Sequence, residues 1–323
     1  MSKKLLIAQP VAEELENFNT YYKESVFCEN KRIQNIIDYV MKSDGKRIRP
    51  ILLLLTAKAC GEINSVTYNG AVTVELLHTA SLIHDDVIDE SEMRRGKPSA
   101  NAIYDNKIAV LAGDFFLSSA LIKGVLTGNI DIITAVSNLG RNLAEGELNQ
   151  LSLVKELILD EKEYFDVIKK KTASLLSVCM RIGALSANAP ESDVEKFAKL
   201  GEYLGICFQM KDDIFDYFDN NIGKPTGNDI REGKVTLPLL YALKNMHTKQ
   251  AEDLFEIIKN SDFSEENIRL LLSFAKDNGG IEYTYTRMEE FKNRALEIIE
   301  TLPDSDVKVS LTEAVYYIIE RVY

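Results

Sequence analysis

Apolar side chains recur at helical spacing along almost the whole chain, whereas no stretch alternates apolar and polar residues convincingly with a period of two. A chain of this kind lacks strands for a sheet and buries its apolar faces by packing helices on helices. We find no linker, internal repeat or low-complexity segment that would require a second domain. The sequence therefore predicts a single all-α domain over residues 1–323.

The helical pattern breaks where glycine and proline gather. Gly96 and Pro98 mark one loop, and three glycines with Pro225 mark another over residues 220–233. The long helices predicted around these breaks cover residues 10–25, 31–41, 51–60, 66–89, 104–126, 130–153, 161–187 and 194–219.

The composition is that of a soluble globular protein and excludes some classes of function. The net charge of −12 argues against nonspecific binding to nucleic acid, which needs a basic surface. The four cysteines are scattered without a CxxC pair and are predicted to be buried apolar residues in a reducing compartment. Neither a signal peptide nor an apolar run close to the roughly 20 residues needed to cross a bilayer is found. We expect a cytoplasmic protein without a transmembrane segment.

Three aspartates end the apolar helix predicted over residues 66–89. At helical spacing Asp85, Asp86 and Asp89 span an arc of roughly 100° on one face, where they repel one another unless a cation lies among them. Carboxylate oxygens suit a hard ion such as Mg²⁺, which keeps water and substrate phosphate in its shell. Arg94 and Arg95 follow closely and would suit those phosphates.

The same spacing of aspartates returns 127 residues later, at the end of a second long helix, as Asp212, Asp213 and Asp216. Either cluster alone is a weak signal, because surface helices often carry neighbouring acids. Together they are more specific, since both end long apolar helices and both precede loops with basic residues. Facing each other, the clusters would hold several Mg²⁺ ions against one diphosphate.

With these two Asp-Asp-x-x-Asp motifs, the chain resembles the trans-isoprenyl diphosphate synthases, or polyprenyl synthetases. The resemblance extends from residues 45–50, Gly-Lys-Arg-Ile-Arg-Pro, to residues 234–238, Lys-Val-Thr-Leu-Pro. It implies the isoprenoid synthase fold, a bundle of long helices around a central cavity, and a homodimer. One departure is Asp44 before Gly45, where the family has a second glycine; we expect a modest effect on the loop.

The resemblance also implies a role for particular residues. The six aspartates would bind the metal ions, roughly three Mg²⁺ per active site with substrate bound, with Mn²⁺ as a substitute. The residues that resemble those holding isopentenyl diphosphate are Lys46, Arg49, His78 and Arg95. Those resembling the clamp on the allylic diphosphate are Arg94, Lys171, Lys224 and Lys234. Those resembling neighbours of the reacting carbons are Thr172 and Gln209. His84 has no partner at metal-ligand spacing and is expected to be structural.

The reaction implied is loss of diphosphate from an allylic substrate, followed by attack of isopentenyl diphosphate on the carbocation. Metals and fixed cations would stabilise the departing charge, and a dry cavity would protect the cation from water.

Small residues precede the first cluster, where short-chain members carry large aromatic residues. Ala80 and Ser81 would leave the product path open. The residues that could then close it deeper down are Val74, Leu77, Leu117 and Leu121. We predict a medium- to long-chain product near octaprenyl, for quinone side chains, with transient membrane contact for its release.

Three alternatives stay open from the sequence. The first is a shorter product, geranylgeranyl or farnesyl diphosphate. The second is a terpene cyclase, which would carry an Asn/Asp-x-x-Ser/Thr-x-x-x-Glu pattern where this chain has Asp212, Asp213 and Asp216. The third, from another class, is a non-catalytic subunit of a heteromeric synthase, although inactive partners lose acids that this chain keeps.

Overall fold

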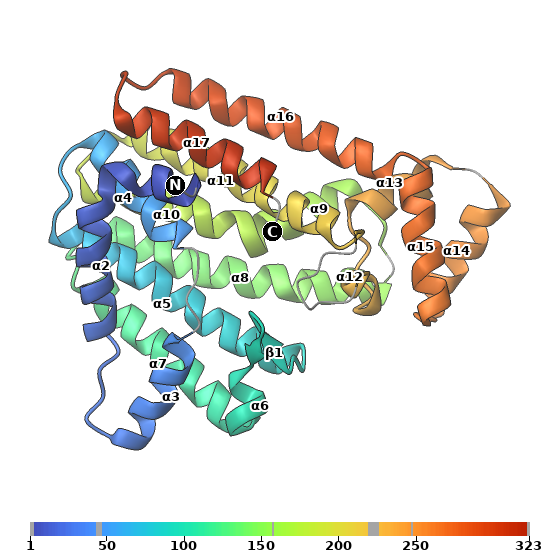
Figure 1. Ribbon diagram of the computed structural model, residues 1–323, viewed down its shortest axis with the longest axis horizontal. Helices are drawn as coiled ribbons and strands as arrows, with labels where there is room; N and C mark the ends of the chain where they lie inside the picture. The colour runs from blue at the N-terminus through green and yellow to red at the C-terminus, as the bar shows by residue number, and fades with distance from the viewer. Residues whose placement is uncertain (1–2, 43–46, 157, 219–225, 247, 322–323) are drawn as a thin grey trace. The chain divides into compact units, whose positions relative to one another are not determined.

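The computed structural model describes residues 3–42, 47–156, 158–218, 226–246 and 248–321. These residues are almost entirely helical, with one two-stranded hairpin among them, which confirms the predicted all-α class (Figure 1). The chain divides into two compact units. The first comprises Met1–Gly140, Leu175–Gly201 and Leu302–Ala314; the second comprises Arg141–Ser174, Glu202–Thr301 and Val315–Tyr323. One domain over residues 1–323 stays a prediction.

The first unit is built mainly from the N-terminal helices. Its elements are α1 (Lys3–Ala8), a 3₁₀ turn (Gln9–Val11), α2 (Ala12–Glu24), α3 (Lys31–Met41), α4 (Ile48–Cys60), α5 (Ser65–Ile88), β1 (Met93–Arg94), β2 (Lys97–Pro98), α6 (Ala100–Tyr104) and α7 (Asn106–Val125), with α10 (Ser174–Ser186) and the first parts of α8 (Ile130–Glu156), α11 (Glu191–Phe215) and α17 (Asp306–Glu320).

The centre of this unit is α5, whose start is fixed by a capping box. Asn64 accepts hydrogen bonds from the backbone N–H groups of Val66 and Thr67, and Thr67 accepts one from the Asn64 backbone. The apolar middle of α5 is buried, and its last turn carries the first aspartate cluster. The helix therefore joins the core to the candidate site without a break.

The helix α7 packs along α5 (Figure 1). His84 covers Gly113, so closely that a Cβ atom at Gly113 would lie 2.2 Å from its Nε2. The same Nε2 lies 3.2 Å from the carbonyl oxygen of Val110 and 3.5 Å from Asp114. His84 therefore packs and bonds between the two helices, which agrees with its predicted structural role.

A short hairpin follows α5 where the sequence predicted only a loop. Met93 pairs with Pro98 and Arg94 with Lys97, and the two turn residues, Arg95 and Gly96, both have positive φ. Such a turn matches the twist of the flanking strands. The hairpin carries two consecutive arginines, Arg94 in its first strand and Arg95 in its turn.

The second unit contains the end of α8, α9 (Glu161–Ile168), a π-helical turn (Lys169–Ala173), the end of α11, and five further helices. These are α12 (Asn228–Arg231), α13 (Leu237–Asn245), α14 (Lys249–Lys259), α15 (Glu265–Asp277) and α16 (Gly280–Glu300). A core that includes Ile214, Tyr217 and Leu239 joins the end of α11 to α13 and the helices that follow it. The helix predicted over residues 161–187 is thus interrupted by the π turn, and α12 lies inside the predicted loop over residues 220–233.

By length and composition alone, α7 is also the one described helix that could cross a membrane. Core helices of soluble proteins pass the same test. Its packing along α5 shows that part of this apolar surface serves the fold.

Candidate active site

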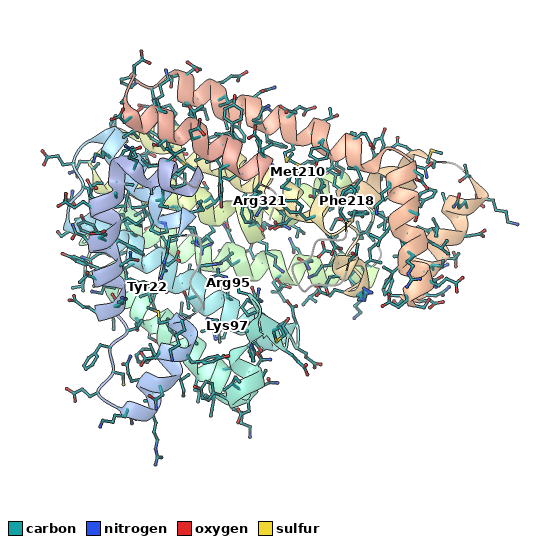
Figure 2. The ribbon with its side chains drawn as sticks, viewed as in Figure 1. Tyr22, Arg95, Lys97, Met210, Phe218 and Arg321 are labelled. Atoms are coloured by element: carbon teal, nitrogen blue, oxygen red, sulfur yellow. The ribbon has the colours of Figure 1, made fainter. Side chains whose placement is uncertain are left out.

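A cationic pocket lies in the first unit, bordered by α2, α3, α5 and the hairpin. Tyr22, Arg95 and Lys97, which line it, are labelled in Figure 2. Among its described lining residues five are cationic and two acidic: Arg47, Arg49, Arg94, Arg95 and Lys97, with Glu75 and Asp86. This excess of positive charge suits an anion such as a diphosphate.

Glu75 organises the arginines of this pocket. It is 4% exposed, and its two carboxylate oxygens accept hydrogen bonds from Arg47 Nη1 at 3.0 Å and Arg49 Nε at 2.9 Å. Burial opposes its ionisation, but the charges around it, that of Arg49 above all, outweigh burial and lower the pKa of Glu75 to about 2. Arg47 also lies 4.8 Å over the ring of Tyr22. The two guanidinium groups are held before any ligand arrives.

His78 lines the same pocket one turn after Glu75. Burial, followed by repulsion from Arg49, lowers the pKa of His78 well below its ordinary value, so the imidazole is neutral at pH 7. A neutral imidazole can donate one hydrogen bond to a phosphate oxygen without adding charge. Of the predicted isopentenyl residues, the structure brings Arg49, His78 and Arg95 to this pocket; Lys46 lies outside the described residues.

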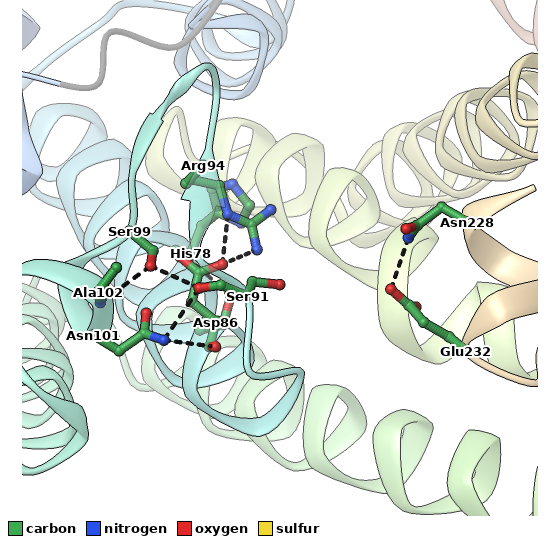
Figure 3. Close-up of polar contacts among 10 residues, drawn as sticks. His78, Asp86, Ser91, Arg94, Ser99, Asn101, Ala102, Asn228 and Glu232 are labelled. Atoms are coloured by element: carbon green, nitrogen blue, oxygen red, sulfur yellow. Dashed lines mark hydrogen bonds and ion pairs between the residues drawn. The ribbon is translucent and has the colours of Figure 1, made fainter. Parts of the chain in front are cut away.

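Asp86 and Arg94, predicted as a metal ligand and a diphosphate clamp, contact each other (Figure 3). Arg94 donates through Nε and Nη2 to one oxygen of Asp86, with the Nε contact at 2.8 Å, and Asp86 is 4% exposed. The backbone carbonyl of Asp86 accepts from Ser91 N, and Asn101 donates to it from α6. This network attaches the hairpin to the end of α5.

Asp85 and Asp89 lie at the C-terminal end of α5, where Asp85 is partly buried and Asp89 is exposed. Negative charge at the C-terminus of a helix is disfavoured, because the last carbonyl groups already carry partial negative charge. The next residue, Glu90, has a φ of 49°, in the left-handed region, as do Arg47 and Arg95 at the pocket. Such backbone strain gathers at functional sites.

The second cluster ends α11 in the second unit, and all three of its acids contact other groups of the protein. Asp213 is 2% exposed; its Oδ2 accepts from Tyr164 at 2.6 Å and its Oδ1 from Gln209 at 2.8 Å. Burial, followed by the charge of Asp229, raises the pKa of Asp213 well above its ordinary value. A buried carboxyl with both oxygens occupied is poorly placed to ligate a metal.

Asp216 accepts from the backbone N–H groups of Asn228 at 2.9 Å and Asp229 at 3.1 Å, which begin α12. Asn228 in turn donates to Glu232 (Figure 3). Asp216 therefore fastens the start of α12 to the end of α11.

Asp212 pairs with Arg321 near the end of the chain. The guanidinium of Arg321 also donates to the carbonyl oxygen of Phe208 at 2.9 Å and lies 3.9 Å over the Phe208 ring. Arg321, labelled in Figure 2, was not singled out from the sequence. It places a fixed cation on the first acid of the second cluster.

Lys171 and Thr172 lie in the π-helical turn. Lys171 pairs with Glu147 and donates to Gln150 at 3.2 Å, both on α8. Thr172 donates to Gln209 Oε1 at 2.7 Å, so these two predicted neighbours of the reacting carbons touch. π-helical turns are rare and occur frequently at functional sites.

The remaining predicted clamp residues are less informative. Lys234 pairs with Glu232 beside α12. Lys224 lies outside the described residues.

The residues predicted to control product length occupy different environments. Val74, Leu77 and Ala80 are buried in α5, and Ser81 is partly buried and donates to the carbonyl oxygen of His78. On α7, Leu117 is partly buried, whereas Leu121 is 53% exposed. A role in chain length stays a prediction for all six, and its exposure counts against Leu121.

Sequence reasoning missed Glu75, Arg47, Tyr164 and Arg321. Glu75 had a usable signal, because it is a lone charge in the apolar run from Ala71 to Leu77, and buried acids are rarely unpaired. For the other three we find no signal without the fold.

The donor set fits a hard divalent cation. No group of three or more Asp, Glu, His or Cys side chains is gathered around a metal position in the described part of the chain. Mg²⁺ does not need one, because it binds through one or two carboxylates and takes water and phosphate oxygens for the rest. Asp89, which is exposed, and Asp85 and Asp212, which are partly buried, can supply such ligands.

Comparison with known proteins agrees with this geometry. The family model described as polyprenyl synthetase matches residues 30–274. The chain belongs to the polyprenyl synthetase family. It is therefore a prenyltransferase, as predicted.

Individual relatives cover nearly the whole chain. An octaprenyl diphosphate synthase of Haemophilus influenzae is 37% identical over 287 residues, which are 88% of this chain and 87% of the relative. The structure resembles a geranylgeranyl pyrophosphate synthase from Bacteroides thetaiotaomicron, with a TM-score of 0.87 and 42% identity over 99% of this chain and 100% of that one. It also resembles a polyprenyl synthase from Caulobacter crescentus, complexed with calcium and isoprenyl diphosphate, with a TM-score of 0.92 and 29% identity over 98% of each chain.

Proposed function

We propose that this polyprenyl synthetase condenses isopentenyl diphosphate with an allylic diphosphate, head to tail and in trans geometry, to make a medium- to long-chain prenyl diphosphate. The cationic pocket of the first unit carries this proposal. Glu75 holds Arg47 and Arg49 in place, and His78 is neutral. Fixed guanidinium groups beside a neutral hydrogen-bond donor suit a small ligand with two or three negative charges.

The pocket is the proposed site of isopentenyl diphosphate. Arg49 and Arg95 would bind the diphosphate oxygens, and His78 would add a neutral hydrogen bond. Lys97, on the other strand of the hairpin, adds a further cation at the rim.

The proposed metal ligands are three acids of the two clusters whose side chains are exposed or only partly buried. These are Asp85, Asp89 and Asp212; calcium bound with isoprenyl diphosphate in the Caulobacter relative supports a divalent cation. Asp86, Asp213 and Asp216 would instead hold the hairpin, Gln209 and α12 in place. When bound, Mg²⁺ or Mn²⁺ would supply positive charge that makes diphosphate a better leaving group.

The chain's own residues have separate roles in the proposed reaction. Arg94, which contacts Asp86, and Lys171, in the π-helical turn, would bind the departing diphosphate, and Lys224 and Lys234 are assigned to the same role from the resemblance alone. Thr172 and Gln209 would direct oxygen dipoles at the positive charge that develops on the allylic carbon.

Two observations bear on product length. The octaprenyl relative from Haemophilus favours a long product, as do the small residues at Ala80 and Ser81. The Bacteroides relative, at 42% identity, favours geranylgeranyl diphosphate as the second candidate.

One incubation separates these candidates. The protein is mixed with farnesyl diphosphate, isopentenyl diphosphate and Mg²⁺, diphosphate release is followed, and products are sized by chromatography. We expect release that EDTA abolishes and either Mg²⁺ or Mn²⁺ restores, with products near octaprenyl. Geranylgeranyl diphosphate alone would select the second candidate, and an inert protein would favour a non-catalytic subunit.

We also propose that the exposed apolar face of α7 is covered by a second copy of the chain, as the family resemblance implies. Leu111, Ile122 and Val125 are 66%, 62% and 65% exposed, an unusual density of bare aliphatic side chains on one helix. Light scattering on the purified protein should give twice the monomer mass, and Ile122→Asp should give the monomer. A monomeric wild-type chain would contradict the proposal. We also propose that the protein is cytoplasmic and contacts the membrane transiently to release its product.

A further inference from the structure

A hydrogen-bond chain in the second unit runs through four side chains from three elements. Tyr164 on α9 donates to Asp213 Oδ2 at 2.6 Å, and Gln209 Nε2 donates to Asp213 Oδ1 at 2.8 Å. Thr172, in the π-helical turn, donates to Gln209 Oε1 at 2.7 Å. The chain begins at a buried tyrosine and ends at a threonine hydroxyl.

The order of donors along this chain fixes the orientation of Gln209. Its amide nitrogen is a donor and faces Asp213 Oδ1, so Oε1 points the other way. Oε1 then accepts the hydrogen bond that the Thr172 hydroxyl donates. The lone pairs of the threonine oxygen are therefore directed away from Gln209. One hydrogen bond to Asp213 thus sets the direction of two oxygen dipoles.

Tyr164 holds the carboxyl group that makes this selection. Tyr164 is 8% exposed and Asp213 is 2% exposed, so water has little access to replace their hydrogen bond. Burial, followed by the charge of Asp213, raises the pKa of Tyr164 well above its ordinary value, and its hydroxyl stays a donor at neutral pH.

Close backbone packing supports the threonine end. A Cβ atom at Gly205 on α11 would lie 2.4 Å from Ala173 Cα, and one at Gly146 on α8 would lie 3.0 Å from the backbone nitrogen of Lys171. The π-helical turn is therefore pressed between two helices at glycine positions, and Thr172 has little freedom to follow a displaced Gln209.

We propose that Tyr164 is a positioning residue for the prenyl transfer: through Asp213 it orients the Gln209 carbonyl and the Thr172 oxygen toward the reacting carbon. This inference rests on the proposed function, in which those two oxygens stabilise the allylic cation. Tyr164 acts on the chemical step and on neither diphosphate site.

The test is Tyr164→Phe, which removes one hydroxyl and keeps the ring. Tyr217→Phe is the matched control, because Tyr217 is also buried and its hydroxyl contacts Thr236 at 3.4 Å instead of Asp213. We expect Tyr164→Phe to lower kcat about tenfold, while KM for both substrates and the Mg²⁺ concentration for half-maximal rate change less than about twofold. Tyr217→Phe should leave all of these within about twofold.

A double-mutant cycle with Thr172→Val shows whether the effect passes through the threonine. If it does, Tyr164→Phe costs less than about twofold in kcat when valine already occupies position 172. Equal tenfold losses in both backgrounds, no loss in the single variant, or a tenfold shift in Mg²⁺ dependence would each overturn the proposal. The last result would mean that Tyr164 presents Asp213 to a metal ion.

Two further measurements separate misfolding and a wrong function from a wrong inference. Gln209→Met interrupts the chain without touching Tyr164, so it should lower kcat even if Tyr164→Phe proves unstable. Failure of the wild-type protein to release diphosphate would refute the proposed function. A normal wild type with an unaffected Tyr164→Phe would refute only the positioning role.

Discussion

Glu75→Gln tests the physical basis of the cationic pocket. The substitution keeps the size of the side chain and an acceptor oxygen, but it leaves Arg47 and Arg49, whose side chains are 18% and 19% exposed, without the charge between them. The pKa of Glu75 is lowered from 4.5 to about 2, because the charges around it, that of Arg49 above all, outweigh the opposing effect of burial. At 1.36 kcal/mol for each unit of pKa, this ion cluster contributes about 3 kcal/mol to folding at pH 7.

The contribution of Glu75 to the free energy of unfolding should depend on pH. A carboxyl whose pKa is depressed by folding stabilises the protein above its unfolded pKa, and this contribution is lost as the pH falls from about 4.5 toward 2. We expect Glu75→Gln to lower the free energy of unfolding by about 3 kcal/mol at pH 7 and by about 2 kcal/mol at pH 3.5. Urea unfolding followed by circular dichroism at both pH values measures the difference.

Glu14→Gln is the control for this experiment. Glu14 pairs with Lys58 on the surface at 3.0 Å, and such exposed pairs contribute less than about 1 kcal/mol. A loss for Glu75→Gln that is no larger than the control, or that does not shrink at pH 3.5, would show that the buried charge does not organise the arginines.

Three further predictions follow from the helices around the site. Ala80→Phe places a ring on the buried side of α5 and should shorten the product while turnover stays measurable; an unchanged product distribution would contradict the proposed path. Gly113→Ala brings a Cβ atom to 2.2 Å from His84 Nε2 and should destabilise the fold by about 1–3 kcal/mol in thermal unfolding, and His84→Ala in the same chain should recover most of that loss. Arg321→Gln removes the cation paired with Asp212, so calorimetry without substrate should show about fivefold tighter Mg²⁺ binding; unchanged or weaker binding would argue against Asp212 as a ligand.

Helix positions could be predicted from sequence because apolar spacing and caps are local. The helix over Lys31–Met41 has the predicted ends, and α5 starts one residue before its predicted start. The π-helical turn could not be predicted, since one widened turn hardly disturbs the apolar pattern of residues 161–187. The hairpin was missed for a similar reason: Arg95-Gly96 lacks the Asn-Gly or Asp-Gly signature of such turns.

Within the site, residue types could be predicted but their partners could not. The spacing of aspartates indicates a metal site, yet it treats all the acids alike. Only the fold shows that Asp86 contacts Arg94, that Asp213 contacts Tyr164 and that Asp216 accepts hydrogen bonds from the start of α12. These partners come from elements distant in sequence or from turns with no strong signature, so local patterns do not reveal them.

The unbroken course of α5 limits how this enzyme can change during evolution. Its pocket residue His78 and the first acid of its cluster, Asp85, are separated by seven residues, or about 10 Å of helix. Inserting or deleting one residue between them would turn the acids by about 100° relative to the pocket. Substitutions can therefore vary the product, as at Ala80, but a viable change of length in this segment would have to come in whole pairs of turns. We expect homologous sequences to vary in side-chain size here and to show no insertions or deletions.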